Sequence, residues 1–311
     1  MQYRRLGTSG LKVSEIGLGC NNFGMRIDQE KTTAVVDAAL EAGITLFDTA
    51  DVYGGTQSEV MLGAALGKRR HDIVLATKFG IPAGPAPYFG GGSRRYIVRA
   101  VEASLTRLGT DYIDLYQMHR PDPETPLDET LRALDDLIAS GKVRYIGNSN
   151  YAGWQIADAD WTARSEGLNR FVSAQNNLSL LERTATHEVL PACERFGLGF
   201  LPFFPLASGL LSGKYRRGAP PPAGTRLAVW GARGAEALSE RNLARVEALT
   251  AWAEARGHTI LELAFAWLLG HPAVSSVIAG ATSPEQVAAN AAAGVWRLTP
   301  AEVAEATALA K

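Results

Sequence analysis

Cysteine is scarce in this sequence, which holds only Cys20 and Cys193 among 311 residues. The two lie far apart and form no Cys-x-x-Cys pair, which argues against a disulfide framework or a cysteine-based zinc site and suits a reducing compartment. Basic blocks are also absent, since 31 Lys and Arg residues are balanced by 32 Asp and Glu residues, for a net charge of -1. The composition therefore gives no sign of a nucleic-acid or anionic-membrane partner.

Long hydrophobic runs are missing as well. No apolar run reaches the roughly 18 residues that a membrane-spanning helix requires. The opening segment Met1–Arg5 is not followed by the apolar stretch of a signal peptide. We therefore expect a cytoplasmic protein.

The hydrophobic content of 46% is ample for a sizeable core. Length alone would suggest two domains, but α/β barrels of this size are routinely one domain. We expect residues 1–311 to form a single domain.

Short apolar segments alternate with helical segments along most of the chain. Strands are predicted at Ile16–Gly19, Ile44–Asp48, Ile73–Lys78, Ile113–His119, Val143–Gly147, Phe171–Gln175, Leu198–Phe203 and Val274–Ala279. Helices are predicted at Asp28–Ala42, Ser58–Leu66, Arg94–Leu108, Leu127–Ser140, Gly153–Ser165, Ala185–Phe196, Ser239–Arg256, Thr259–Leu269, Pro284–Ala293 and Pro300–Ala310. Apolar strands without alternation are typical of sheets buried on both faces, and strand–helix alternation indicates parallel βαβ units.

Eight such units predict an α/β fold, the (β/α)8 TIM barrel, with extra C-terminal helices. The segments Tyr3–Leu6 and Leu11–Ser14 flank a Gly-containing turn and predict an N-terminal β-hairpin that plugs one end of the barrel.

Two long segments, Gly80–Ser93 and Ala207–Ser239, interrupt the alternation. Both follow predicted strands, so both should lie over the C-terminal face of the barrel. Loops of this length without secondary structure are usually functional or disordered. A mobile surface loop is the alternative interpretation.

Four polar residues lie at or just after the ends of three consecutive predicted strands. Asp48 ends the second strand, Tyr53 lies in the loop behind it, and Lys78 and His119 end the third and fourth strands. In a βα-barrel these strand ends converge on the face where active sites are built. Alone, each residue has an ordinary explanation as a turn cap, a packed ring, a solvated lysine or a loop histidine. Together they favour a catalytic site.

The four side chains are chemically complementary. A tyrosine can protonate a carbonyl oxygen if its pKa falls from about 10 toward neutrality. A nearby lysine cation would lower that pKa. Lys78 is the candidate cation with Asp48 as its counter-ion, and His119 is a candidate hydrogen-bond donor to the same oxygen.

Other chemistries fit poorly. The segment Gly17–Asn22 begins like a dinucleotide fingerprint but lacks the third glycine and leads into a loop. The segment Gly209–Tyr215 resembles a P-loop that is one residue short and has Tyr where Ser or Thr should bind magnesium. A metal hydrolase would need several ligands at strand ends, whereas only His119 of five histidines is so placed. No metal is predicted.

Eight further stretches form a specific series: Gly17–Gly19, Phe47–Gly54, Ala76–Gly80, Asp111–Tyr116, His119–Asp122, Gly147–Asn150, Pro205–Tyr215 and Ile278–Gln286. With this series the sequence resembles the aldo-keto reductase superfamily over nearly the whole chain. The resemblance implies NADPH-dependent reduction of aldehydes and ketones, with hydride from the nicotinamide and the proton from Tyr53. It also implies that Lys78, tied to Asp48, lowers the tyrosine pKa and that His119 orients the carbonyl.

The resemblance further implies a set of cofactor contacts. Ser149, Asn150 and Gln175 match residues that hold the nicotinamide carboxamide, whose donors and acceptors suit these side chains. Phe203 matches an aromatic ring that stacks on the nicotinamide. The remaining implied contacts run from the pyrophosphate to the adenosine: Leu206, Lys214, Arg226, Thr282, Gln286 and Asn290.

The cofactor preference departs from the family pattern. Many NADPH-preferring members carry Arg or Lys at positions matching Gly280, Thr282 or Gln286, and this sequence has none there. Ala289 stands where an acidic residue is common. We expect NADP(H) rather than NAD(H), from Arg226, Thr282 and the family tendency.

A pocket for a carbonyl substrate is predicted to be shaped by Asn22, Phe23, Tyr53, Tyr88, Phe89 and Trp230. Two alternatives stay open. One is an NAD(P)+-dependent sugar or alcohol dehydrogenase that uses the same site in reverse. The other is a cofactor-binding regulatory subunit that senses redox state, as some members of the family are.

Overall fold

Eight parallel strands form the centre of the molecule. The computed structural model describes residues 1–82, 84 and 89–311. Within them the strand order is β10-β3-β4-β5-β6-β7-β8-β9. The strands are β3 (Ile16–Gly19), β4 (Leu46–Asp48), β5 (Val74–Phe79), β6 (Ile113–Met118), β7 (Val143–Ser149), β8 (Ser173–Gln175), β9 (Gly199–Phe200) and β10 (Val277–Gly280).

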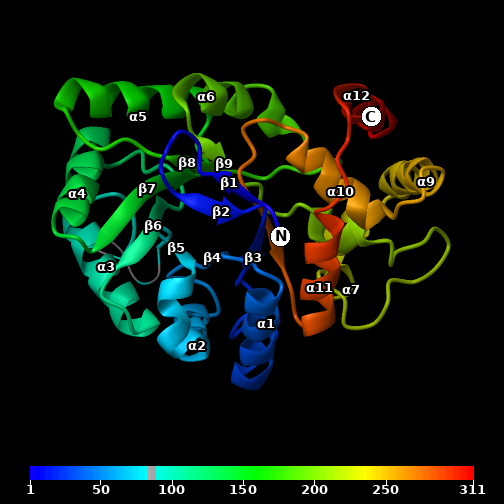
Figure 1. Ribbon diagram of the computed structural model, residues 1–311, viewed down its shortest axis with the longest axis horizontal. Coiled ribbons are helices and arrows are strands. Elements are labelled where there is room, and N and C mark those ends of the chain that lie inside the picture. Colours follow the sequence, from blue (N-terminus) through cyan, green and yellow to red (C-terminus); the bar gives the residue numbers. More distant parts are fainter. Residues whose placement is uncertain (83, 85–88) are drawn as a thin grey trace.

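β9 pairs with the segment just before β10, and this contact closes the barrel. The Phe200 N–H donates to the Ala273 carbonyl at 2.7 Å, and the Ser275 N–H donates to the Phe200 carbonyl at 3.0 Å. A parallel bridge joins Phe200 to Val274 at the same place. The predicted (β/α)8 barrel is therefore confirmed, and Figure 1 shows the strands enclosed by helices.

The helices pack around the barrel and bury the outer faces of the strands. The α-helices are α1 (Gln29–Glu41), α2 (Gln57–Leu66), α3 (Arg94–Leu108), α4 (Leu127–Ala139), α5 (Gly153–Glu166), α6 (Val189–Phe196), α7 (Arg226–Val229), α8 (Ala232–Ala237), α9 (Glu240–Glu254), α10 (Ile260–Leu269), α11 (Pro284–Ala293) and α12 (Pro300–Leu309). Short 3-10 helices are η1 (Gly67–Asp72), η2 (Thr184–Thr186) and η3 (Ala207–Ser212).

Polar residues in the sequence fix where several helices begin and end. The Asp28 side chain accepts a hydrogen bond from the Lys31 N–H at 3.0 Å and caps α1. Ser93 caps α3 through the Tyr96 N–H, and Gly109 ends that helix with a φ of 63°. Such caps satisfy backbone groups that have no partner inside the helix.

The N-terminal hairpin closes the opposite end of the barrel from the strand C-termini. Its strands are β1 (Tyr3–Arg5) and β2 (Lys12–Ser14), and in Figure 1 it lies across the barrel centre. The turn residue Gly7 has a φ of +58°, and a Cβ there would lie 2.3 Å from the Gly197 carbonyl oxygen. Apolar side chains of the hairpin pack with those inside the barrel: Leu6, Val13, Leu46, Val74, Leu115, Leu201 and Ile278.

The segment from Ala207 to Ser239 is not a structureless loop, and this expectation was wrong. It contains η3, α7 and α8. Leu210, Leu211 and Leu227 are buried within it, so burial of apolar side chains orders a stretch whose Pro and Gly content suggested a loop. In the other long loop, the Gly92 N–H donates to Asp122 at 2.7 Å. Tyr88 of that loop lies outside the described residues.

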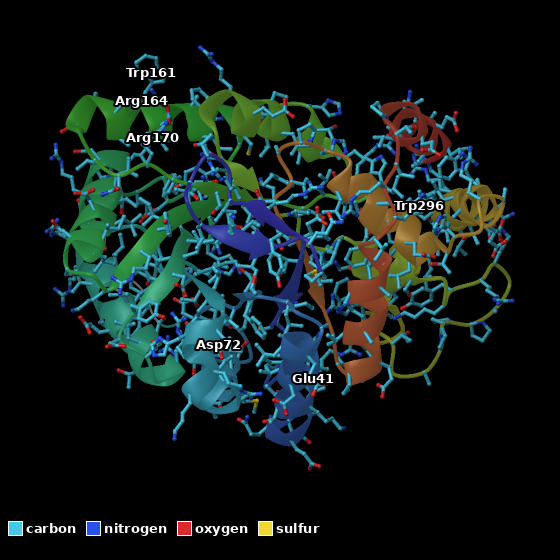
Figure 2. The ribbon with its side chains drawn as sticks, in the orientation of Figure 1. Glu41, Asp72, Trp161, Arg164, Arg170 and Trp296 are labelled. Carbon is cyan, nitrogen blue, oxygen red and sulfur yellow. The ribbon has the colours of Figure 1, made fainter. Side chains whose placement is uncertain are left out.

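Figure 2 labels Arg164, Arg170 and Trp296, which make contacts at the periphery of the barrel. On α5, Asp160 accepts from Arg164 at 2.6 Å and from Arg170 at 2.7 Å. Before α12, the Trp296 ring stacks on His258 at a centroid distance of 3.9 Å. No helix formed by the described residues combines the length and the apolar character needed to cross a membrane.

Candidate active site

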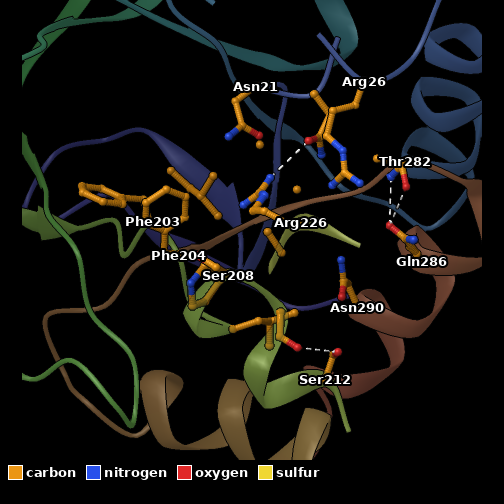
Figure 3. Close-up of a pocket in the computed structure, with 18 of the residues that line it drawn as sticks. Asn21, Arg26, Phe203, Phe204, Ser208, Ser212, Arg226, Thr282, Gln286 and Asn290 are labelled. Carbon is orange, nitrogen blue, oxygen red and sulfur yellow. Dashed lines mark hydrogen bonds between the residues drawn. The ribbon is translucent and has the colours of Figure 1, made fainter. Parts of the chain in front are cut away.

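A cavity of about 740 Å³ opens between the C-terminal ends of the strands and the segment that carries η3 and α7. One end is lined by Asp48, Tyr53 and His119, and the other by residues of α11 and the loop before it. All ten residues predicted to contact a cofactor line this cavity: Ser149, Asn150, Gln175, Phe203, Leu206, Lys214, Arg226, Thr282, Gln286 and Asn290. Figure 3 shows the part of the cavity around Arg226, Thr282 and Asn290.

An ion pair lies beneath the end of the cavity that Tyr53 and His119 line, which we call the candidate catalytic end. The Lys78 Nζ atom, on β5, lies 2.5 Å from Oδ2 of Asp48, on β4. It also donates to the Thr49 carbonyl at 2.9 Å and lies 3.4 Å from the Tyr53 hydroxyl. Lys78 is fully buried. Burial by itself would lower the pKa of Lys78, but the charges of Asp48 and Tyr53 outweigh it and leave the pKa raised, so the lysine is a cation.

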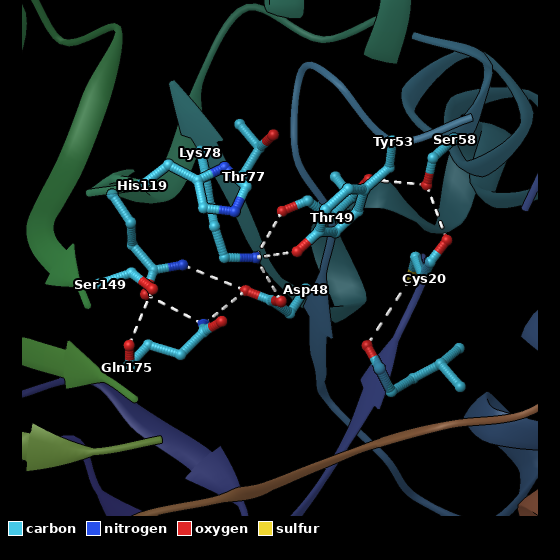
Figure 4. Close-up of polar contacts among 12 residues, drawn as sticks. Cys20, Asp48, Thr49, Tyr53, Ser58, Thr77, Lys78, His119, Ser149 and Gln175 are labelled. Atoms are coloured by element: carbon cyan, nitrogen blue, oxygen red, sulfur yellow. Dashed lines mark hydrogen bonds and ion pairs between the residues drawn. The ribbon is translucent and has the colours of Figure 1, made fainter. Parts of the chain in front are cut away.

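Two glutamine side chains hold the second oxygen of the carboxylate. Oδ1 of Asp48 accepts from Gln117 Nε2 at 3.1 Å and from Gln175 Nε2 at 2.9 Å. Figure 4 shows Asp48 between Lys78 and Gln175. Both oxygens of the buried acid therefore have donors, which is what stabilises a charged group away from water. Sequence reasoning missed Gln117. Its signal was an amide within a predicted strand that pairs in register with Lys78.

Lys78 acts on the pKa of Tyr53 in the direction expected from the sequence, but the net shift of this pKa is upward. Burial of the side chain raises this pKa above its usual value, and the lysine cation of Lys78 opposes the rise without reversing it. The nearby charge of Asp48 also raises it. Tyr53 therefore carries its proton at neutral pH and can act as a donor.

His119 lies edge-on against Tyr53, with ring centroids 5.7 Å apart and planes at 79°. Burial, followed by the charges of Lys78 and Arg120, lowers the pKa of His119 to about 3. The imidazole is therefore neutral at physiological pH, and a neutral imidazole has one N–H donor. Its Nδ1 atom is buried and has no hydrogen-bond partner among the described residues.

A second pair of buried acids lies behind the loop that follows β4. Asp51 accepts from the Tyr96 hydroxyl at 3.1 Å, while its other oxygen is buried without a partner among the described residues. Glu59 on α2 accepts from Thr77 and from Arg107, both at 2.6 Å. Burial and the charge of Glu59 raise the pKa of Asp51 to about 7. Asp51 is thus largely protonated below neutral pH.

Amide and hydroxyl groups line the wall next to the catalytic end. Ser149 Oγ donates to the Gln175 carbonyl at 2.8 Å. Asn150 Nδ2 donates to the His119 carbonyl at 2.9 Å and lies 3.0 Å from Ser149 Oγ. The Asn150 backbone has a φ of 61°, a conformation that Asn adopts more readily than most residues. These contacts fix the side chains of β7 and β8 at the cavity wall.

The far end of the cavity is built around the start of α11. Gln286 Oε1 accepts from the Thr282 N–H at 2.9 Å and from its hydroxyl at 3.2 Å. Arg226 lies on the facing rim and donates to Asn22 Oδ1 at 3.2 Å. Arg26, which the sequence reasoning missed, also lines the cavity. Its sequence signal was a basic residue in a strand-to-helix loop on the C-terminal face.

The predicted substrate pocket is only partly correct. Asn22 and Tyr53 line the cavity, whereas Phe23, Phe89 and Trp230 do not. The Phe23 side chain is fully buried in the core. The guanidinium of Arg99 lies 4.3 Å from the centre of the Phe89 ring. Phe204, which was not predicted, lines the cavity beside Phe203, with ring centroids 5.3 Å apart.

Comparison with known proteins agrees with this geometry. A sequence model of the aldo/keto reductase family matches residues 15–311. An uncharacterized oxidoreductase of Bacillus subtilis, YrpG, is 40% identical over 299 residues, which cover 92% of this chain and 89% of that protein. A probable voltage-gated potassium channel subunit beta of Arabidopsis thaliana is 38% identical, covering 93% of this chain and 90% of that protein.

A further relative, versiconal hemiacetal acetate reductase of Aspergillus parasiticus, is 35% identical over 334 residues, with 97% of this chain and 95% of that protein covered. Both the family match and these identities extend over nearly the whole chain. The chain therefore belongs to the aldo/keto reductase family of NAD(P)H-dependent oxidoreductases.

Proposed function

We propose that this protein reduces an aldehyde or ketone to the alcohol with NADP(H), and that Tyr53 supplies the proton. The observation that carries the proposal is the placement of the Tyr53 hydroxyl 3.4 Å from the Lys78 ammonium, at the cavity end that His119 also lines. A proton donor, a buried cation and a neutral imidazole thus face one point where a carbonyl oxygen can bind.

Tyr53 donates its proton to the carbonyl oxygen as the carbon is reduced. The phenolate that remains on Tyr53 is stabilised by the Lys78 cation, which Asp48 holds in place at 2.5 Å. Because burial raises the pKa of Tyr53, this phenolate is reprotonated readily after the reaction. The neutral His119 ring donates a hydrogen bond to the same oxygen and orients the substrate.

The cavity suits a nicotinamide dinucleotide. Ser149, Asn150 and Gln175 offer donors and acceptors for a carboxamide at the catalytic end, and Phe203 offers an aromatic face. When bound there, the nicotinamide supplies the hydride. Arg226 and Lys214 lie at the other end, where the phosphates and the adenosine of the cofactor would bind. The preference for NADP(H) over NAD(H) is part of this proposal and is supported by these two cations.

The two free cysteines, which are both buried, support a reducing cytoplasm as the compartment. The same chemistry run in reverse would make the protein an NAD(P)+-dependent dehydrogenase. Rates in both directions at physiological cofactor ratios distinguish the two.

A second candidate is favoured by two relatives at 38% identity that are named probable voltage-gated potassium channel subunit beta. On this proposal the protein binds the cofactor chiefly to report redox state to a partner. It predicts tight NADPH binding with negligible turnover, together with a partner recovered in stoichiometric amount.

The test is NADPH oxidation with a reactive aromatic aldehyde such as 4-nitrobenzaldehyde, by the wild type and by Tyr53→Phe. Loss of a general acid costs about 10²- to 10⁴-fold in rate, so we expect a loss of this size in kcat while the Kd for NADPH stays within about twofold. A Tyr53→Phe variant that retains full kcat would overturn the assignment of the proton donor. A wild type that binds NADPH but does not turn over would favour the regulatory subunit.

A further inference from the structure

Three cations from separate parts of the chain converge on the far end of the cavity. Arg26 lies in the loop between β3 and α1, Lys214 follows η3, and Arg226 opens α7. All three line the cavity, and we call them the cationic corner. Figure 3 shows Arg26, Arg226 and Thr282 around the same part of the cavity.

The cationic corner has no acidic counterpart in the part of the chain that the structure describes. Among the described residues, no carboxylate lies within ion-pair distance of Arg26, Lys214 or Arg226. The two arginines bind neutral oxygens instead: Arg26 donates to the Gly224 carbonyl at 2.8 Å, and Arg226 donates to Asn22 Oδ1 at 3.2 Å. Three like charges held together at a cavity wall form a site for a multiply charged anion.

The charges act on one another. Burial, followed by the charge of Arg26, lowers the pKa of Lys214 and also that of Arg226. Arg26 is therefore close enough to both groups to disfavour their charged forms. A bound anion would relieve this repulsion.

A chain of hydrogen bonds places the cationic corner against the adenosine end of the cavity. Asn22 Oδ1 accepts a hydrogen bond from Arg226. Asn22 Nδ2 donates to the Ala281 carbonyl at 3.2 Å. Ala281 immediately precedes Thr282, whose N–H and hydroxyl bind Gln286. Arg26 belongs to the same loop as Asn22, so both arginines face the start of α11.

The α11 side of this corner contributes no charge of its own. The residues that line the cavity there are Gly280, Thr282, Gln286, Ala289 and Asn290. They offer hydroxyl and amide groups, which suit a ribose or a phosphate but do not by themselves favour a phosphate over a hydroxyl group. A charge that favours a phosphate over a hydroxyl group must therefore come from the residues that face α11 across the cavity.

We propose that Arg26 binds the 2′-phosphate of NADP(H) from the rim opposite α11 and sets the preference for NADP(H) over NAD(H). This inference rests on the proposed use of a nicotinamide dinucleotide. The bond to Gly224 fixes one edge of the guanidinium and leaves its other N–H groups for phosphate oxygens, for which the planar fork of arginine is well matched.

The experiment measures the Kd of NADPH and of NADH by quenching of tryptophan fluorescence, without any carbonyl substrate, for the wild type, Arg26→Gln and Arg26→Lys. A charged hydrogen bond to phosphate is worth about 10- to 100-fold in affinity. We expect Arg26→Gln to weaken NADPH by about that factor and NADH by less than about twofold. Arg26→Lys, which keeps the charge, should fall between the wild type and Arg26→Gln for NADPH.

Arg216→Gln is the matched control, because it removes the same charge two residues from Lys214 on an exposed side chain that does not line the cavity. It should change neither Kd by more than about twofold. Equal losses for both cofactors in Arg26→Gln would overturn the inference and place Arg26 on the diphosphate that both share. An unchanged Kd for NADPH would overturn it as well.

The outcome is separable from that of the catalytic proposal. A wild type that prefers NADPH through Arg26 but reduces no carbonyl would leave this inference intact and remove the reductase assignment. A wild type that reduces aldehydes but binds NADPH and NADH with equal affinity would leave the reductase assignment intact and overturn this inference. Arg26 is exposed, so its replacement leaves the core intact, and an unchanged urea unfolding midpoint verifies this.

Discussion

The two ends of the cavity handle charge in opposite ways. At the catalytic end the buried Lys78 cation is neutralised by Asp48 at 2.5 Å, and Asp48 receives two further amide donors. At the end proposed to bind the nucleotide, Arg26 and Arg226 bind only neutral oxygens of the described protein. The cation at one end is paired with a carboxylate of the protein, whereas the arginines at the other end are paired with neutral oxygens.

This difference separates the two tasks of a reductase. A site that performs chemistry gains from groups whose positions and charges are fixed in advance, because no reorganisation is then needed during the reaction. A site that selects a ligand gains from charge that only the correct ligand neutralises. The predictions that follow test this contrast, beginning with the largest expected effect.

Removing the cation at the catalytic end should destabilise the fold. Lys78→Met leaves Asp48 as a buried carboxylate without a counter-ion, which costs about 3–5 kcal/mol of unfolding free energy. Urea unfolding measures this loss. Lys142→Met breaks an exposed ion pair with Glu102 and should cost less than about 1 kcal/mol.

The double variant Asp48→Asn/Lys78→Met sharpens this test, because it removes both charges of the pair. It should recover much of the stability that Lys78→Met loses. If Lys78→Met were no less stable than Lys142→Met, the pair could not be the buried, mutually dependent unit described above.

Asp51 provides a contrast near the same end of the cavity, since it is a buried acid that forms no ion pair with any described residue. Its pKa is raised from 3.8 to about 7, chiefly by burial. Between these pH values the folded state keeps a proton that the unfolded chain has lost, so this group makes stability fall as pH rises from about 4 to about 7. Above pH of about 7 its contribution is constant.

Asp51→Asn removes this ionisation. The variant should gain stability over the wild type by an amount that is larger at pH 8 than at pH 5, by on the order of 2–4 kcal/mol in urea unfolding. Asp111→Asn replaces an exposed acid. Any change that it makes in the unfolding free energy should be the same at pH 5 and at pH 8. A gain for Asp51→Asn that does not depend on pH would contradict the assigned protonation of Asp51.

Salt should weaken cofactor binding at the cationic corner and leave the catalytic rate unchanged. The cationic corner is partly exposed, so raising KCl from about 0.05 M to about 0.3 M should weaken NADPH binding several-fold by screening. The effect should be smaller for NADH, which carries less charge. The kcat at saturating cofactor should stay nearly constant, because the Lys78–Asp48 pair is buried. A kcat that falls in parallel with affinity would contradict the separation of the two ends.

The sequence was sufficient to predict the barrel fold and the proximity of Asp48, Tyr53, Lys78 and His119. Strand alternation places Asp48, Lys78 and His119 at strand ends, and parallel strands bring those ends together without further information. The hairpin plug was also predicted, whereas the closing contact at Phe200 was not, because the alternation of strands and helices does not by itself prove that the sheet closes. The alternation of strands and helices does not predict where an individual side chain points. Phe23 was therefore expected at the substrate pocket, although it is fully buried.

Effects that depend on burial or on distant pairing could not be predicted. The raised pKa of Tyr53 arises because desolvation outweighs the Lys78 charge, and the balance between them is set by packing. Arg26 donates a hydrogen bond to Gly224, which lies 198 positions away in the sequence. No local sequence pattern predicts that contact. Gln117 gains its place beside Asp48 only through the register of β5 and β6.

The most direct test of the account is the single-turnover rate of NADPH oxidation, with cofactor prebound at saturation and an aromatic aldehyde added by rapid mixing. The account predicts that Tyr53→Phe slows this step by at least about 100-fold and that Arg26→Gln, once saturated with NADPH, leaves it within about twofold of the wild type. A Tyr53→Phe variant as fast as the wild type, or an Arg26→Gln variant as slow as Tyr53→Phe, would contradict the assignment of chemistry to one end of the cavity and cofactor selection to the other.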